Sequence, residues 1–418
     1  MRISKVAVAA VIAVAGTAQA GSLTLDQAIQ LAMTRNERAE IAKLDVTIAD
    51  AQLAQARTAF LPIVDASGQA QYRPRNDPSV TANGTLALSQ PIYQPTTFSL
   101  YAQAKHTLAA KNAQSIDDRR RLAYDAANAF LDVLLAEEVL QAAQRKLETA
   151  EVNVKTTTAQ KEAQLVSSND VTRAQVDLAS AQRELASSKG DVDASYVDLE
   201  LVINQKVTPG LSAPVELLSI GTQAVSADAS LIEQSIGRRA DLVASKEVAA
   251  AAKEFAKVPR AAYLPSFDFG AQITATTDDR NGNTVDGLLA ISAKWTLWDS
   301  GERSAQVRQR DAQTRIAELQ AQQLAREIDA DVRSAVVTLN SRQQVLTAAA
   351  SARDAARKGA DEAAILYKQG LAKAIELVDA NEQRFIAEVN YATSEFDVER
   401  AYLALRLAMG LDPVEEQK

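Results

Sequence analysis

The sequence predicts a mainly α-helical protein with a β part: two duplicated antiparallel helical hairpins, and four strands that contribute to a transmembrane β-barrel. Three observations predict it. Two stretches, 61–73 and 267–276, alternate apolar and polar residues as a strand with one apolar face does. Two tracts, 96–208 and 266–412, contain no proline, the strongest single helix breaker, and are rich in good helix formers. The same landmarks also occur twice in order.

The N-terminal segment 1–20 is typical of a secretory signal peptide. Arg2 and Lys5 precede an apolar run over 6–15, and Ala18-Gln19-Ala20 offers a small-x-small cleavage pattern. Without Arg2 and Lys5 the chain has 43 basic and 53 acidic residues, so it lacks the basic footprint of a nucleic-acid partner. The absence of cysteine excludes disulfides, thiolate metal sites and a lipid-bearing cysteine. No later segment approaches 18 consecutive apolar residues, so a membrane-spanning part would consist of strands.

A duplication organises the chain. Three landmarks return at offsets of 203, 205 and 206: Phe60-Leu61-Pro62 as Tyr263-Leu264-Pro265, Ile92-Tyr93 as Leu297-Trp298, and Asp170-Val171 as Glu376-Leu377. So long a period indicates one duplicated unit rather than a solenoid of short repeats. The expected organisation is a signal peptide (1–20), a first repeat (21–205), an equatorial segment between the repeats (206–230), a second repeat (231–410) and a C-terminal tail (411–418).

Each repeat is predicted to contain the same elements in order. A helix leads through Leu-Pro into a first strand, and a polar turn leads into a second strand. A long helix of about 100 Å, at 1.5 Å per residue, and a returning helix then form a hairpin. Ala123, Ala127, Phe130 and Leu134 have the spacing of a helix seam. The expected bounds are 25–58 and 231–257 for the opening helices, 74–78 and 278–284 for the turns, 81–92 and 286–297 for the second strands, 96–163 and 300–368 for the long helices, and ends near Asn204 and Met409-Gly410 for the returning helices.

The apolar strand residues are expected to face lipid: Val64, Ala66, Tyr72, Leu86, Leu88, Phe267, Phe269, Ile273, Leu289, Ile291 and Trp295. For Tyr72 and Trp295 the alternatives are an interfacial aromatic girdle and a packed core. Four strands cannot close a barrel, because the smallest single-chain examples have about eight. An open sheet edge in lipid costs several kcal/mol for each unsatisfied backbone group, so the chain must oligomerise. Two copies would supply roughly eight strands and three roughly twelve, and this argument does not choose between them.

The sequence resembles the TolC family of trimeric outer-membrane efflux and secretion ducts over its whole mature length. The residues that carry the likeness are Leu25-Asp26-Gln27-Ala28-Ile29, Leu88-Ser89-Gln90-Pro91-Ile92-Tyr93, Arg239-Ala240-Asp241-Leu242, Trp295-Thr296-Leu297-Trp298-Asp299-Ser300-Gly301, Gly370 and Glu376-Leu377-Val378-Asp379-Ala380. The resemblance implies a homotrimer in the Gram-negative outer membrane, with a 12-stranded barrel continuous with a periplasmic helical tunnel. It also implies a periplasmic adaptor and an inner-membrane pump or ABC secretion transporter as partners.

Three positions depart from the family pattern. Glu37 stands where a proline is usual, Gln164 where the first hairpin turn has glycine, and Ala372 where an arginine is often found. The last change bears on whether a salt bridge locks the closed tip.

The resemblance places the aperture at the hairpin tips. Glu376 and Asp379 lie three residues apart, hence on one helix face, and in a trimer they would form a carboxylate ring that favours cations. The alternative is that acids in a first helical turn complement the helix dipole. Asp170, at the equivalent point of the first repeat, is expected to cap its helix with Asn169 or to line the gate. Tyr367 matches a family tyrosine that contacts the neighbouring hairpin, and otherwise it is a seam aromatic.

Catalysis finds no support, and no enzyme activity, cofactor or metal is expected. The single histidine, His106, lies within a long helix as a solvated or packed residue, and no nucleophile with a base, metal-ligand cluster or phosphate loop is present. Arg119-Arg120-Arg121 is interpreted as a solvated helix face at a hairpin interface, rather than as a binding patch.

Two functions are open at this stage. The favoured one is a passive outer-membrane duct for efflux or type I secretion. The alternative is a secreted periplasmic coiled-coil or adaptor-like protein that never crosses lipid. The matched alternating strands favour the duct, because an adaptor would show one hairpin and no lipid-facing strands. The cargo stays open.

Overall fold

The computed structural model describes residues 22–74, 79–227, 229–278 and 282–413. The expected signal peptide, the middle of both strand turns and most of the expected C-terminal tail lie outside them. The described helices and strands follow in this order: α1 (Leu25–Arg35), α2 (Glu37–Thr58), β1 (Ile63–Arg73), β2 (Ser79–Tyr93), α3 (Pro95–Glu162), α4 (Ser168–Ile203), α5 (Val215–Gly221), α6 (Ala229–Arg238), α7 (Ala240–Phe255), α8 (Val258–Ala261), β3 (Ser266–Asp278), β4 (Gly282–Lys294), α9 (Glu302–Lys368) and α10 (Ala374–Ala408).

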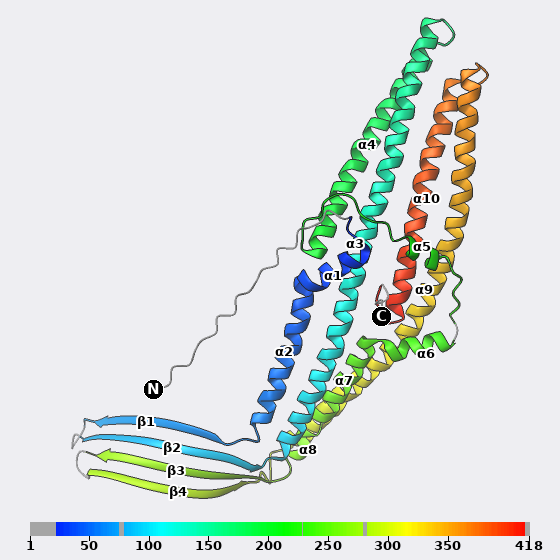
Figure 1. Ribbon diagram of the computed structural model, residues 1–418. Coiled ribbons are helices and arrows are strands. Elements are labelled where there is room, and N and C mark those ends of the chain that lie inside the picture. The colour runs from blue at the N-terminus through cyan, green and yellow to red at the C-terminus, as the bar shows by residue number, and fades with distance from the viewer. Residues whose placement is uncertain (1–21, 75–78, 228, 279–281, 414–418) are drawn as a thin grey trace, which may run out of the picture.

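The molecule is elongated, with a sheet at one end and two helical hairpins at the other (Figure 1). α3 with α4 and α9 with α10 form the hairpins, while α2 and α7 continue along α3 and α9 toward the sheet. No described helix combines the length and apolarity that a membrane span requires. The predicted fold class, with duplicated hairpins and four strands per chain, is confirmed.

The sheet repeats the duplication in its register. The strands are antiparallel in the order β1-β2-β3-β4, so the two repeats join at β2 and β3. Ile63 pairs with Ser89 in the first repeat, and Ser266 with Lys294 in the second. The two pairs are related by an offset of 203 in one strand and 205 in the other, the same offsets that relate the sequence landmarks.

The core lies where α3 meets the other helices. The predicted seam residues Ala123, Ala127 and Phe130 are buried, and Phe130 belongs to a large apolar cluster with residues of α1, α4 and α10. Many of the other buried seam residues are alanines, which let helix backbones approach closely. The long helices are therefore held by one another along their length.

Both predicted opening helices are broken, which corrects the prediction of continuous helices over 25–58 and 231–257. The first breaks at Asn36, whose side chain accepts a hydrogen bond from the Arg38 N–H (2.9 Å) and donates one to the carbonyl of Val202 (2.7 Å). The second breaks at Arg239, the equivalent point of the second repeat. The first break forms although Glu37 replaces the family's proline, because the Asn36 cap and its tertiary bond satisfy the backbone.

Smaller differences concern connections. The segment between the repeats, expected to be irregular, contains the short helix α5, which packs against α10. Trp295, predicted as a strand residue, follows the end of β4, and its indole Nε1 donates to the carbonyl of Tyr263 (3.0 Å). His106 pairs with Glu247 of α7 (Nδ1 to Oε2, 2.7 Å).

Candidate functional site

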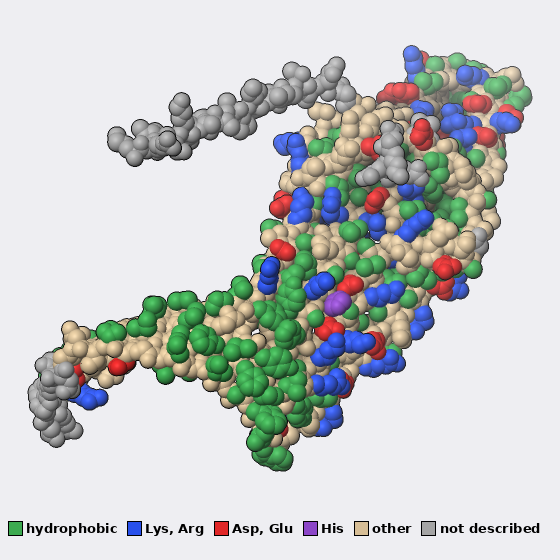
Figure 2. Space-filling model, turned by 60° about the horizontal axis from the view of Figure 1, so that its bottom comes forward, with side chains coloured by type: hydrophobic (Ala, Val, Ile, Leu, Met, Phe, Trp, Pro, Cys, Tyr) green, Lys and Arg blue, Asp and Glu red, His purple; other side chains and the backbone are tan. Residues whose placement is uncertain are grey.

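The sheet leaves its apolar face uncovered. Strand pairing places Val64 opposite Leu88, Leu86 opposite Ile273, and Phe269 opposite Ile291, so these side chains share one face. The same alternation puts the other predicted lipid-facing residues of the four strands on that face. All of β1 and β4 is exposed, with Val64 63% and Ile291 72% accessible. Figure 2 shows hydrophobic side chains gathered over the sheet and the adjoining end of the helices.

The opposite face of the sheet is mostly polar. Thr81 Oγ1 donates to Asp278 Oδ2 (3.3 Å), and the hydroxyls of Thr85 and Thr274 lie 3.3 Å apart. On the two central strands most of this polar face is less exposed than the apolar one. A sheet with this polarity resembles part of a barrel wall, with polar groups inside and apolar groups outside.

Aromatic side chains line the strand-to-helix junction of the first repeat. The rings of Phe60 and Phe98 lie 5.2 Å apart, and those of Phe60 and Tyr101 6.0 Å apart. In the second repeat, the Arg303 guanidinium stacks on the Tyr263 ring at 4.3 Å instead. The two junctions therefore have the same place in the fold but different chemistry.

At the second hairpin tip, Glu376 and Asp379 both lie exposed on α10. The Lys373 N–H donates to Glu376 Oε2 (3.4 Å), so Glu376 also caps its helix. At the first tip, Asp170 accepts bonds from the Ser167 N–H (3.0 Å) and hydroxyl (2.7 Å). Asp170 thus caps its helix with Ser167 rather than Asn169, because α4 begins at Ser168 and Asn169 is already helical.

Tyr367 joins the two hairpins near their tips. Its side chain is 4% exposed and packs with Ala374 and Leu377 of the second hairpin. Its hydroxyl lies 2.9 Å from that of Thr157 in α3, which is fully buried. Tyr367 therefore contacts both hairpins, whereas Glu376 and Asp379 remain exposed to solvent.

Below the tips lies a buried carboxylate that the sequence analysis did not identify as a site. Glu388 of α10 accepts bonds from Arg145 of α3 (3.2 Å), Arg357 of α9 (2.9 Å) and Arg384 of α10 (3.2 Å). Burial alone would raise the pKa of Glu388, but the arginines hold that pKa below its usual range. The i, i+4 spacing of Arg384 and Glu388 was a local signal. Arg145 of α3 and Arg357 of α9 lie too far from Glu388 in the sequence for any local pattern to link them to it.

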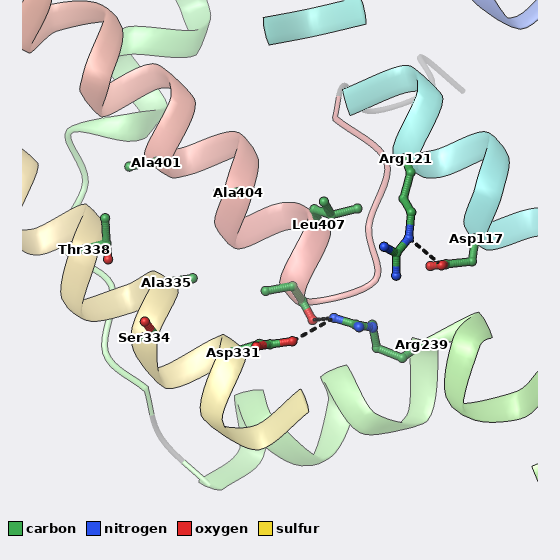
Figure 3. A pocket seen from close by; sticks show the side chains of 11 residues that line it. Asp117, Arg121, Arg239, Asp331, Ser334, Ala335, Thr338, Ala401, Ala404 and Leu407 are labelled. Atoms are coloured by element: carbon green, nitrogen blue, oxygen red, sulfur yellow. Dashed lines mark hydrogen bonds and ion pairs between the residues drawn. The ribbon is translucent and has the colours of Figure 1, made fainter. Parts of the chain in front are cut away.

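A second network ties the helix breaks to the hairpin ends. Arg239 binds Asp241 (Nε to Oδ1, 2.9 Å) and donates to the carbonyl of Ala408 at the end of α10 (3.3 Å). Arg239, Asp331 and Ala408 line a cavity of about 360 Å³. Figure 3 shows Arg239 pointing toward Asp331 and the end of α10. Asn36 makes the matching bond to Val202, near the end of α4.

The arginine run beside this cavity is only in part the solvated face that was predicted. Arg120 is 11% exposed at its side chain and pairs with Asp412 (3.3 Å), while Arg121 pairs with Asp117 (2.7 Å). The pair between Arg120 and the C-terminal segment joins groups 292 positions apart. Local charge patterning does not reveal such a contact.

An uncovered amphipathic sheet at the base of two tall hairpins is the arrangement expected of a channel protein of the outer membrane. The sequence matches the Outer membrane efflux protein family over residues 28–205 and 231–411, and the chain belongs to that family. Members of this family are channels in the outer membrane, not enzymes. The resemblance noted from the sequence and the expected lack of enzymatic activity are thereby confirmed.

Solved structures share the fold at low sequence identity. The chain is similar to CusC (16% identity, TM-score 0.81, covering 93% of this chain and 92% of that one). It is similar to the CmeC outer membrane channel of Campylobacter jejuni (16% identity, TM-score 0.79, covering 94% of this chain and 87% of that one). It is also similar to the open state of the MtrE outer membrane channel of Neisseria gonorrhoeae (20% identity, TM-score 0.80, covering 93% of this chain and 89% of that one). A search of curated protein sequences finds no significant match.

Proposed function

We propose that three copies of this chain form a duct through the outer membrane, with the hairpins forming a periplasmic tunnel. The duct exports substrates delivered from the periplasm, or by an inner-membrane pump or ABC secretion transporter through a periplasmic adaptor. The observation that carries the proposal is the uncovered four-stranded sheet, with one apolar face and no second neighbour for β1 or β4 within the described chain. The family match and the resemblance to trimeric ducts support it.

The sheet edges explain why several copies are needed. An edge strand in lipid leaves backbone groups without partners, at several kcal/mol each. If β4 of one copy pairs with β1 of the next, each edge is satisfied, and three copies supply roughly twelve strands. The apolar residues of the strands then face lipid, and a cleaved signal peptide over 1–20 brings the chain to the membrane.

The internal duplication gives a register for this pairing. Inside the chain, Leu86 of β2 pairs with Ile273 of β3. The offset of 205 carries Leu86 to Ile291 of β4, and the offset of 203 carries Ile273 back to Ala70 of β1. Quasi-equivalence therefore places Ile291 of one copy opposite Ala70 of the next.

Cysteine cross-linking tests the assembly, because the natural chain has no cysteine. In outer membranes, the double variant with Ile291→Cys and Ala70→Cys is expected to give a covalently closed trimer on oxidation. The control pair, Leu289→Cys with Ala66→Cys, lies several positions out of register and should cross-link poorly. Soluble monomers, or equal cross-linking of both pairs, would contradict the proposal and favour an adaptor-like protein.

A carboxylate ring at the hairpin tips gives the proposed duct its preference for cations. Three copies would place six acidic side chains, from Glu376 and Asp379, around the opening, where such a ring attracts cations. In single-channel recordings, Glu376→Gln with Asp379→Asn should reduce cation preference and block by polyvalent cations. Glu362→Gln, an exposed acid on α9, serves as the control. Unchanged selectivity in the double variant would remove these residues from the gate.

A further inference from the structure

The two hairpins of one chain meet along a seam between α3 and α10. Phe396 and Leu403 of α10 belong to the same apolar cluster as Phe130 and Leu134 of α3. Glu399 lies between Phe396 and Leu403 on this stripe, since spacings of three and four residues keep side chains on one helix face. A carboxyl group therefore sits within an apolar stripe of the contact between the hairpins.

Glu399 is buried without a full set of partners. The residue is 5% exposed, and its Oε2 has no hydrogen-bond partner within the described chain. An ionised carboxylate in such a place is strongly disfavoured, whereas the protonated form is tolerated. Glu388, three turns away on the same helix, is similarly buried but is held by three arginines.

On balance, the neighbouring charged groups of α10 also disfavour an ionised Glu399. Glu395 lies one turn from Glu399, and its charge opposes ionisation of Glu399. Arg400 is adjacent and favours ionisation, but it also binds Asp132 of α3 and Asp397. Burial first, and then the charge of Glu395, raises the pKa of Glu399 to about 8.

Among the described residues, no basic side chain of the helices packed against α10 forms an ion pair with Glu399. α3 contributes Glu138, which repels Glu395, and Arg353 of α9 offsets part of that repulsion. Tyr196 of α4 donates to Glu137 of α3 (2.6 Å), and α5 presents the exposed Glu216. The surroundings therefore favour the uncharged carboxyl group.

We propose that Glu399 is a proton-operated latch between the two hairpins: in its uncharged form it allows α10 to pack on α3, and its ionisation loosens that seam. The latch is a property of a single chain, so it goes beyond the proposed duct.

The direction of the pH effect follows from linkage. The closed seam keeps a proton that an opened, hydrated Glu399 would release above its ordinary pKa of 4.5. The proton on Glu399 stabilises the closed seam fully below pH 4.5, and this stabilisation is lost as the pH rises to about 8. Opening therefore becomes more favourable over that window, by up to about tenfold per pH unit, and levels off above it.

Distance measurements between the hairpins test the latch. Spin labels on Val152→Cys in α3 and Ile386→Cys in α10, both exposed positions, report the separation in full-length protein. Labelled chains are diluted with unlabelled ones so that only distances within a chain contribute. Between pH 6 and pH 9, the wild-type distance distribution should broaden toward longer values.

Variants separate the latch from a general effect of pH. Glu399→Gln is a neutral isostere and should keep the short distance across the whole range. Glu395→Gln removes a like charge, which makes ionised Glu399 less unfavourable in the closed seam, so the opening at pH 9 should be smaller than in the wild type. Glu162→Gln, an exposed acid near the tip of α3, should behave as the wild type does.

Three results would overturn the latch. The wild-type distance could stay constant between pH 6 and pH 9, or Glu399→Gln could respond to pH as the wild type does. The third is an opening of Glu395→Gln at pH 9 that equals or exceeds that of the wild type. None of these results bears on whether the chain forms a trimeric duct, which the cross-linking experiment decides.

Discussion

The two repeats build the same architecture with different residues at equivalent points. The opening helix breaks at Asn36 in one and at Arg239 in the other, and each residue donates to a carbonyl near the end of the returning helix. The hairpin tips turn through Gln164 (φ 62°) and Gly370 (φ 75°). The duplicated fold therefore depends on satisfying the same backbone groups, and more than one side chain can do so.

The ends of the returning helices show the same principle. Asn204 (φ 50°) and Gly410 (φ 72°) both adopt the left-handed conformation. Asn204 uses its side chain to donate to the carbonyl of Arg35 (3.1 Å) and to Glu37 Oε1 (3.1 Å). At Gly410 the backbone of Arg238 and Arg239 comes so close that a Cβ atom would lie 3.2 Å from it. Placing the residue of the first repeat at Gly410 is therefore expected to lower the stability of the protein more than an exchange at the other equivalent positions.

The largest effect is expected for Gly410→Ala. The substitution combines a strained positive φ with a close contact to backbone, which together should destabilise the protein by about 2–4 kcal/mol. Thermal unfolding in detergent measures this loss. Gly370→Ala is the matched control, because it has a similar φ but open space around its Cβ position. Equal losses in the two variants would show that the close approach at Gly410 does not matter.

The helix breaks should come next. Arg239→Ala leaves Asp241 largely buried without its partner and removes the bond to Ala408, so we expect a loss of about 2–3 kcal/mol. Asn36→Ala removes one cap and one tertiary bond and should cost about 1–2 kcal/mol. Denaturant unfolding compares the two. A larger loss at Asn36 would reverse the expected ranking of the two breaks.

Only the second repeat supplies a tyrosine to the contact between the hairpin tips. Tyr367 reaches Thr157 from the second repeat, while the equivalent residue of the first repeat is Lys161. Tyr367→Phe keeps the ring and removes only the hydroxyl, so a loss of about 1 kcal/mol is expected in denaturant unfolding. Thr157→Val is the complementary variant, and the double variant should lose little more than either single one. Fully additive losses would mean that the two hydroxyls do not act as a pair.

The smallest effect is expected at the first tip. Gln164→Gly relieves a left-handed non-glycine residue and should raise stability by about 0.5–1 kcal/mol, partly offset by the greater freedom of glycine in the unfolded chain. Gly370→Gln should lower it by a similar amount. Because the tip can unfold locally, hydrogen exchange of the neighbouring amides is the most sensitive measurement. A loss of protection in Gln164→Gly would indicate that the glutamine side chain makes a contribution of its own.

The long elements could be predicted from the sequence because their signals are local. The uninterrupted alternation over 61–73 indicated β1 and its faces, and the lack of proline indicated α3 and α9. The duplicated landmarks indicated offsets that the strand register repeats. The assignment of the strand residues to lipid, and of the tip residues to a gate, stays a prediction, since both depend on neighbours outside a single chain.

By itself, the sequence determined the strands, the hairpins and their duplication, because hydrophobic period and backbone propensity act over a few residues. Only the tertiary structure decided where the opening helices break and which buried carboxylates of α10 are paired. Asn36 meets Val202 although they lie 166 positions apart, and Arg145 meets Glu388 across 243 positions. No local pattern specifies such partners, because the chain brings them together only once its long helices have packed.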